Sequence, residues 1–185
     1  MQRWKTLSRR TVLDSGKFLK VESHTVELPD GQIIPDWPWV VTPDYVIVVV
    51  VTEAGEFLCF RQTKYAIAGM SLALVGGYLE PGEEPLAAAQ RELREETGYE
   101  APDWIPLGRY VVNGNRGCGV ANLFLARRAH WATPTNADDL EEQQLLRLNR
   151  AEVEEALMDG EFKGLAWAAA LVLALFWLER RQSEK

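Results

Sequence analysis

The feature that most constrains the fold is an unbroken run of β-branched and aromatic residues from Tyr45 to Thr52, YVIVVVVT. A strand with one face in water alternates apolar and polar residues. This run does not alternate, which predicts a strand covered on both faces. Turn-forming residues follow at 53–56 and lead into a second predicted strand, Phe57 to Gln62. We therefore expect a sheet with helices on both of its sides.

The N-terminal part of the chain has the pattern of a β-hairpin. Residues Lys17 to Leu28 are extended and partly alternating, and Pro29-Asp30-Gly31 supplies a tight turn before Ile33 and Ile34. The stretch from Pro35 to Pro43 holds too many prolines for a central strand. We expect it to be an edge strand or a connector, and we place a domain boundary near its end.

The remainder of the chain mixes strands with helices. Two strands are predicted at Leu107–Asn113 and Val120–Arg127, with a glycine-rich loop between them. A capping-box start at Asn149 predicts a helix that ends before Gly160. The last predicted helix covers Gly164 to Leu178. It is shorter than the roughly 20 apolar residues of a membrane span, so we expect it to be buried, with a membrane tail anchor as the alternative.

These elements predict a mixed α and β fold in two parts. A small N-terminal antiparallel β subdomain would cover residues 1–42 and a main domain residues 43–185. With 185 residues and 47% hydrophobic content, the chain can bury a core. Its net charge of −7 offers no basic surface for a nucleic-acid backbone, so no nucleic-acid partner is expected.

Targeting signals and cysteine spacing point to the cytoplasm. The N-terminus is basic but has no apolar segment of the kind that precedes a secretory cleavage site, and no membrane partner is expected. Cys59 and Cys118 are far apart and match no metal-ligand spacing. We expect both to be reduced thiols.

One helix concentrates carboxylates. Pro85 suits the first turn of a helix, residues 86–97 favour helix, and Gly98 suits a left-handed C-terminal cap. The spacing of i, i+3 and i+4 places three glutamates on one face of this helix: Glu92, Glu95 and Glu96. Like charges so placed repel each other. Either the face is simply solvated, or it binds a hard divalent cation such as Mg²⁺, which prefers oxygen ligands.

The residues around this helix follow a longer pattern. Gly77 is followed after five residues by Glu83, after seven more by Arg91-Glu92-Leu93, then by Glu95-Glu96 and Gly98-Tyr99 with one residue before each pair. This segment, 77–99, resembles the Nudix box over its full length. The final position of the box is normally aliphatic, so Tyr99 is a departure. The resemblance implies a Nudix-type α/β/α sandwich with a mixed sheet.

The resemblance also implies a role for each box residue. Glu92 and Glu96 would be the main metal ligands, with Glu95 as a further ligand or water holder and the Gly77 carbonyl completing the shell. Glu95 and Glu96 would thereby take part in catalysis. Glu83 and Arg91 would form an orienting ion pair. The metal, Mg²⁺ or Mn²⁺, would neutralise a diphosphate and lower the pKa of the attacking water.

Segments outside the box are similar to the ADP-ribose pyrophosphatase group of this family. They are LPDG in the N-terminal hairpin, FRQTKYA, VGGYLEPGE and the helix EVEEALMDGEF. The implied reaction splits a nucleoside-diphosphate sugar into a nucleoside monophosphate and a sugar phosphate. One departure is Gly114, which stands where the group commonly has a proline. The alternatives are a nucleoside-triphosphate or dinucleoside-polyphosphate hydrolase and a nucleotide sensor without turnover, against which the intact carboxylates argue.

Further candidates lie outside the box. Arg61 and Lys64 are predicted to reach diphosphate oxygens, with ordinary surface charges as the alternative. Trp37 and Trp39 are candidates for stacking on the base, with core packing as the alternative. A general base is expected in the acidic run 138–142, where Glu142 is the first choice and Glu141 the second; a solvated loop is the competing interpretation.

We expect a homodimer in which the N-terminal unit packs on the partner subunit. A short β unit is marginal alone in water, yet this one is rich in large apolar side chains that need a surface. In the group that the chain resembles, this unit often reaches across to the partner, so that each active site borrows residues from both chains. A monomer in which the unit folds back on its own body is the competing interpretation.

Overall fold

The computed structural model describes residues 2–135 and 143–182. The chain divides into two compact units. Unit 1 comprises Met1–Asp44 and Tyr110–Ala121, and unit 2 comprises Tyr45–Arg109 and Asn122–Lys185. The sequence placed residues 110–121 in the main domain, whereas their contacts assign them to unit 1.

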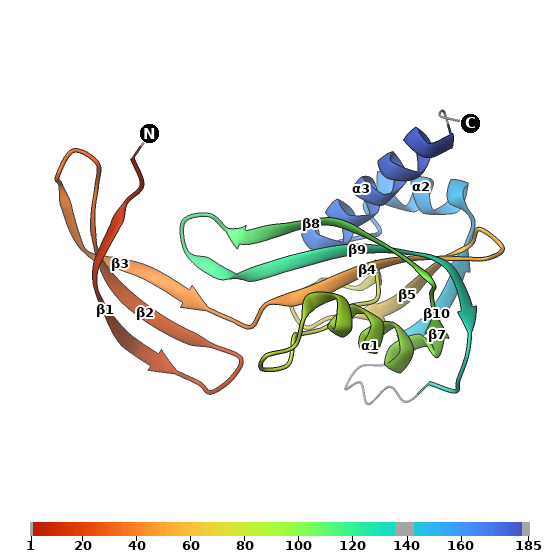
Figure 1. Cartoon of the computed structure of the whole chain (residues 1–185), viewed down its shortest axis with the longest axis horizontal. Coiled ribbons are helices and arrows are strands. Elements are labelled where there is room, and N and C mark those ends of the chain that lie inside the picture. The colour runs from red at the N-terminus through yellow and green to blue at the C-terminus, as the bar shows by residue number, and fades with distance from the viewer. Residues whose placement is uncertain (1, 136–142, 183–185) are drawn as a thin grey trace. The chain divides into compact units, whose positions relative to one another are not determined.

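Unit 1 is built on an antiparallel meander of β1 (Lys5–Asp14), β2 (Lys20–Glu27) and β3 (Ile33–Val41) (Figure 1). The predicted turn between the second and third strands is present, with the Leu28 amide donating to the Gln32 carbonyl at 2.8 Å. Strand β1 was not predicted. Every residue of β1 is exposed, so its sequence lacks the burial pattern by which a strand is recognised.

The proline-rich stretch is strand β3 and not a connector. It pairs with β2 from Lys20↔Val41 to Glu27↔Ile33, and Pro38 lies within this ladder opposite Ser23. On its other edge, the described register with the next strand is the single parallel pair Val40↔Gly117. Along most of the edge of β3 that faces β9, the strand therefore needs no backbone N–H donors. This explains why β3 tolerates Pro35 and Pro38, which lack an N–H group.

Unit 2 contains the strands of the main sheet. Two of them cross the boundary between the units, because one ends and the next begins within residues 110–121 of unit 1. The strands are β4 (Tyr45–Thr52), β5 (Phe57–Thr63), β6 (Met70–Ala73), β7 (Tyr99–Glu100), β8 (Asp103–Asn113), β9 (Gly117–Trp131) and β10 (Gln143–Leu148). The strand order is β9-β4-β5-β10, while β6 pairs with β5 and both β7 and β8 pair with β9. Strands β6 and β10 were missed in the sequence, and β8 and β9 are longer than predicted.

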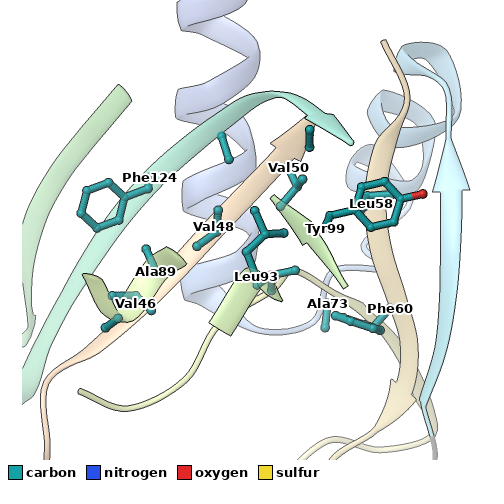
Figure 2. Packing of buried hydrophobic residues seen from close by; sticks show 14 residues of the cluster. Val46, Val48, Val50, Leu58, Phe60, Ala73, Ala89, Leu93, Tyr99 and Phe124 are labelled. Carbon is teal, nitrogen blue, oxygen red and sulfur yellow. The ribbon is translucent and has the colours of Figure 1, made fainter. Parts of the chain in front are cut away.

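In the part of the chain that the structure describes, three helices accompany the sheet: α1 (Pro85–Thr97), α2 (Arg150–Met158) and α3 (Leu165–Gln182). Both α1 and α3 contact β4, in which Val46, Val48 and Val50 are fully buried on one face and Ile47 and Val49 are buried on the other. The prediction of a strand covered on both faces is confirmed. Figure 2 shows Ala89 and Leu93 of α1 beside the three valines of the first face.

The two C-terminal helices differ in how well they were predicted. Helix α2 has the expected capping box, in which the Asn149 side chain accepts from the Glu152 amide. Helix α3 buries only one face, whereas Leu165, Val172 and Phe176 are exposed, so the expectation of a buried helix is only half right. Among the described residues, no helix is long and apolar enough to cross a membrane.

Candidate metal centre

The carboxylate helix α1 begins and ends where its sequence predicts. Pro85 occupies the first turn, and Gly98 caps the C-terminus in the left-handed region at φ 73°, with its amide donating to the Arg94 carbonyl at 2.9 Å. Ala88, Ala89 and Leu93 are fully buried against the sheet. This buried stripe fixes the rotation of the helix about its own axis and thereby decides where its glutamates lie.

Two of the glutamates lie against a pair of glycines that precede the helix. Glu96 accepts a hydrogen bond from the Gly76 amide at 3.2 Å. A β-carbon added to Gly77 would come within 2.2 Å of a Glu92 carboxylate oxygen. Only glycine leaves room for this carboxylate, so Gly77 forms a cradle for Glu92.

Arg91 and Glu83 form the ion pair that the resemblance implies, and its geometry is bidentate. The Arg91 Nε and Nη2 donate to the two oxygens of Glu83 at 2.9 and 3.0 Å, and Nη2 also donates to the Tyr78 carbonyl at 3.2 Å. The guanidinium lowers the pKa of Glu83, which stays ionised. Glu83 also accepts from the Glu80 amide at 2.9 Å, so the loop before α1 is tied to the helix.

The third nitrogen of Arg91 contacts the other glutamates. Nη1 donates to Glu92 at 2.8 Å and to Glu95 at 3.1 Å. Burial raises the pKa of Glu92, while Arg91 opposes that rise. Desolvation is the largest influence on this carboxylate and disfavours its ionised form.

The donor chemistry of the site fits a hard divalent cation, but its geometry is not preformed. Among the described residues, no group of three His, Cys, Asp or Glu side chains is placed to hold a metal ion. Glu92 and Glu95 are turned to Arg91, and Glu96 is turned to the Gly76 amide. The three carboxylates share one helix face, so rotations of their side chains are sufficient to bring them together.

The Gly77 carbonyl, a predicted metal ligand, accepts a hydrogen bond from the Val46 amide at 2.9 Å. The Val48 amide donates to the Val75 carbonyl at 2.8 Å. In an antiparallel pairing, the residue between two such acceptors turns its own amide and carbonyl to the opposite edge. The residue in between is Gly76, whose amide does face Glu96. Sequence reasoning missed this glycine.

The departure at the last box position has a tertiary cause. Tyr99 is buried in the core cluster, and its hydroxyl accepts a hydrogen bond from the Arg147 guanidinium on β10. An aliphatic residue at this position would leave Arg147 without this acceptor. The tyrosine is therefore compatible with the box helix and adds a tie between its C-terminal end and β10.

The basic residues predicted to bind diphosphate lie at strand β5. Arg61, on β5, is about half exposed and forms an ion pair with Glu161 at 3.9 Å. Lys64 follows the end of the strand and is partly exposed. The general-base candidates Glu141 and Glu142 lie outside the described residues.

Trp37 and Trp39 line a cavity of about 430 Å³ in unit 1. The Trp37 indole N–H donates to the Asn115 carbonyl at 2.7 Å, and the Trp4 ring meets Trp37 edge-on with the ring centroids 5.0 Å apart. The buried His24 ring stacks on Trp39, with 5.3 Å between centroids and 19° between planes. One face of Trp39 is therefore already occupied.

Sequence reasoning missed the other residues of this cavity. They are Trp4, Thr6, His24, Val26, Gly114 and Asn115. The strand register is the signal that would have found His24, which pairs directly with Trp37. Gly114, the departure noted in the sequence, lies in the wall of this cavity.

Two family models match the chain in succession. The NUDIX domain matches residues 41–169, which is more than half of the chain. The nucleoside diphosphate sugar hydrolase N-terminal domain matches residues 4–40. The second match covers the strand meander of unit 1, and the first contains the carboxylate helix.

Individual proteins agree with these matches. The chain is 28% identical over 171 residues to the methanol dehydrogenase activator of Bacillus methanolicus, covering 92% of this chain and 90% of that protein. It is also 28% identical over 153 residues to the ADP-ribose pyrophosphatase of Bacillus subtilis (strain 168), covering 83% and 80%. A crystal structure of an ADP compounds hydrolase matches with a TM-score of 0.81 at 24% identity, covering 98% of this chain and 97% of that one, which shows a shared fold.

Proposed function

This chain belongs to the Nudix family, and from that membership we propose that it hydrolyses the diphosphate linkage of nucleoside-diphosphate sugars. The products are a nucleoside monophosphate and a sugar phosphate. The observation that carries the proposal is the carboxylate face of α1 packed on Gly76 and Gly77, with Glu83 and Arg91 holding the loop to the helix. The N-terminal family match and the ADP-ribose pyrophosphatase relative support a sugar-linked substrate.

Glu92 and Glu96 are the main ligands that we assign to the metal, Mg²⁺ or Mn²⁺, with Glu95 as a further ligand or a holder of water. A bound divalent cation neutralises diphosphate oxygens and lowers the pKa of the attacking water. For the backbone ligand we propose the Gly76 carbonyl beside that of Gly77, because the Gly77 oxygen already accepts from Val46. Glu83 and Arg91 position the ligands and do not touch the reacting atoms.

Other roles are proposed for residues outside the box. Arg61 and Lys64 would pair with diphosphate oxygens, for which the exposure of Arg61 leaves room. Glu142, with Glu141 as second choice, would activate the water. Replacing both of these glutamates by glutamine should lower kcat by roughly 10²–10⁴-fold, the usual value of a positioned base. A loss below about tenfold would remove them from the mechanism.

We propose that the unit 1 cavity binds the base of the substrate, with Trp37 as the stacking surface. Trp37→Leu should raise KM about tenfold with little change in kcat, because stacking on an aromatic ring is worth roughly 1–3 kcal/mol per base. Trp37→Phe is the matched control. It keeps an aromatic face and loses the hydrogen bond to Asn115, so its KM should rise less. The measurement is the KM of each variant by steady-state kinetics. Equal KM values for both variants and the wild type would contradict the assignment of Trp37 as the stacking surface.

We also propose a cytoplasmic homodimer. All residues of β1 are exposed, and its apolar side chains Leu7, Val12 and Leu13 are 43%, 57% and 48% exposed. Light scattering at micromolar concentration should give twice the mass of one chain, and Val12→Asp should shift it toward one chain, while Val12→Thr should not. A wild-type mass of one chain would contradict the dimer.

A hydrolysis panel with Mg²⁺ tests the proposed reaction. It should include ADP-ribose, other nucleotide sugars, NADH, dinucleoside polyphosphates and nucleoside triphosphates. Release of a sugar phosphate and a nucleoside monophosphate supports the proposal. Release of inorganic diphosphate from triphosphates favours the nucleoside-triphosphate hydrolase, and tight binding without turnover favours the nucleotide sensor.

A further inference from the structure

We propose that Arg91 is a built-in counter-ion of the carboxylate face of α1 and that a divalent cation must displace its Nη1 from Glu92 and Glu95. The guanidinium stays anchored to Glu83 through its other two nitrogens. This inference rests on the proposed metal-dependent function and describes how the same site loads its metal.

The guanidinium divides into two halves with different partners. Nε and Nη2 make a bidentate pair with Glu83, and Nη2 adds the Tyr78 carbonyl, so this half is held by three hydrogen bonds of 2.9 to 3.2 Å. Among the described residues, the partners of Nη1 are Glu92 and Glu95, at 2.8 and 3.1 Å. The Nη1 half can therefore lose its partners while the other half stays in place.

The oxygens that Nη1 holds are those that a metal needs. Nη1 binds Oε1 of Glu92, and this same oxygen lies closest to the Gly77 cradle. The second Nη1 partner is Oε2 of Glu95. A carboxylate shared between a guanidinium and a divalent cation binds both less well, because two cations on one site repel. Metal binding and the Nη1 contacts therefore compete.

Competition and simple orientation predict opposite effects of losing Arg91 on metal affinity. If Arg91 only positions the glutamates for the metal, then removing either member of the Arg91–Glu83 pair weakens metal binding. If Nη1 competes with the metal, then losing the guanidinium strengthens metal binding. Losing Glu83 weakens it, because the freed guanidinium then turns fully to Glu92 and Glu95.

The test compares Arg91→Lys with Glu83→Gln in the full-length, metal-stripped protein. A single lysine ammonium cannot hold Glu83 and both other glutamates at once. Titration with Mn²⁺ alone, followed by the electron paramagnetic resonance of free Mn²⁺, gives the dissociation constant without any turnover. We expect Arg91→Lys to bind Mn²⁺ roughly three- to tenfold more tightly than wild type and Glu83→Gln to bind it roughly three- to tenfold less tightly. Weaker binding by both variants overturns the proposal.

A measurement on the wild type keeps the proposal testable if a variant does not fold. Nitrogen-15 spectra of the arginine side chains, with Arg91 assigned by its loss in a variant or by its coupling to the backbone, follow both halves of the guanidinium. Addition of Mg²⁺ should change the Nη1 signals and leave the Nε–H signal in place. Unchanged Nη1 signals at saturating Mg²⁺ overturn the proposal.

These outcomes are separate from those that test the reaction. If the wild type hydrolyses nucleotide sugars while both variants lose Mn²⁺ affinity, the proposed function stands and the displacement of Arg91 is wrong. If the wild type shows the displacement but hydrolyses nothing in the panel, the displacement stands and the proposed reaction is wrong.

Discussion

Glu96→Gln is expected to fold like the wild type and to lose about 10³-fold in kcat. The glutamine oxygen can still accept the hydrogen bond from the Gly76 amide, so the fold around α1 is retained. The negative charge, however, is lost from the face that we assign to the metal. A metal ion contributes several kcal/mol of transition-state stabilisation, and each 1.36 kcal/mol corresponds to a factor of ten in rate.

The measurement is a progress curve at saturating Mg²⁺, with circular dichroism to verify the fold. Glu155→Gln is the matched control, because this exposed glutamate lies on α2, outside the carboxylate face. Its rate should equal that of the wild type. Near-wild-type rates for Glu96→Gln, or for Glu92→Gln, would show that the active site has been assigned to the wrong face.

Gly77→Ala should lower kcat/KM by about 10²-fold while leaving the melting temperature within a few degrees of the wild type. The added methyl group would lie 2.2 Å from one oxygen of Glu92 and 2.6 Å from the other. The colliding atoms are the end of a flexible side chain, which can rotate away without disturbing the backbone. The fold therefore survives, but a proposed metal ligand is pushed out of its cradle.

Gly76→Ala is the informative comparison. Its methyl group would lie 2.3 Å from the Val46 carbonyl oxygen, which belongs to the central strand and cannot move aside. We expect this variant to lose stability, seen as a drop in melting temperature larger than that of Gly77→Ala. If Gly77→Ala keeps full activity, the Glu92 carboxylate is not needed where the structure places it.

Much of the site could be predicted from the sequence because its determinants are local. Helical periodicity alone places Glu92, Glu95 and Glu96 on one face, and Pro85 and Gly98 mark the ends of the helix. The pairing of Arg91 with Glu83 is implied by the resemblance to the Nudix box, and the structure brings the two together. Likewise, the run from Tyr45 to Thr52 implies burial on both faces without any knowledge of its neighbours.

Elements without a local signal could not be predicted. Strand β1 is exposed along its whole length, and β3 carries prolines that argue against a strand; both are strands because β2 pairs with them. The short strand β6 and the strand β10 are likewise defined by their pairing with β5. A strand is stable only when it pairs with another segment, and its own residues do not specify which segment that is.

The order of residues along the chain was enough to propose a carboxylate face on one helix, an arginine beside it and Gly77 before it. What each of these groups contacts depends on the fold. Gly76 meets Glu96 across 20 residues, Tyr99 meets Arg147 across 48, and Trp37 meets Asn115 across 78. Contacts between residues so far apart in the sequence depend on how the sheet and the helices pack. The spacing of side chains along the chain does not predict them.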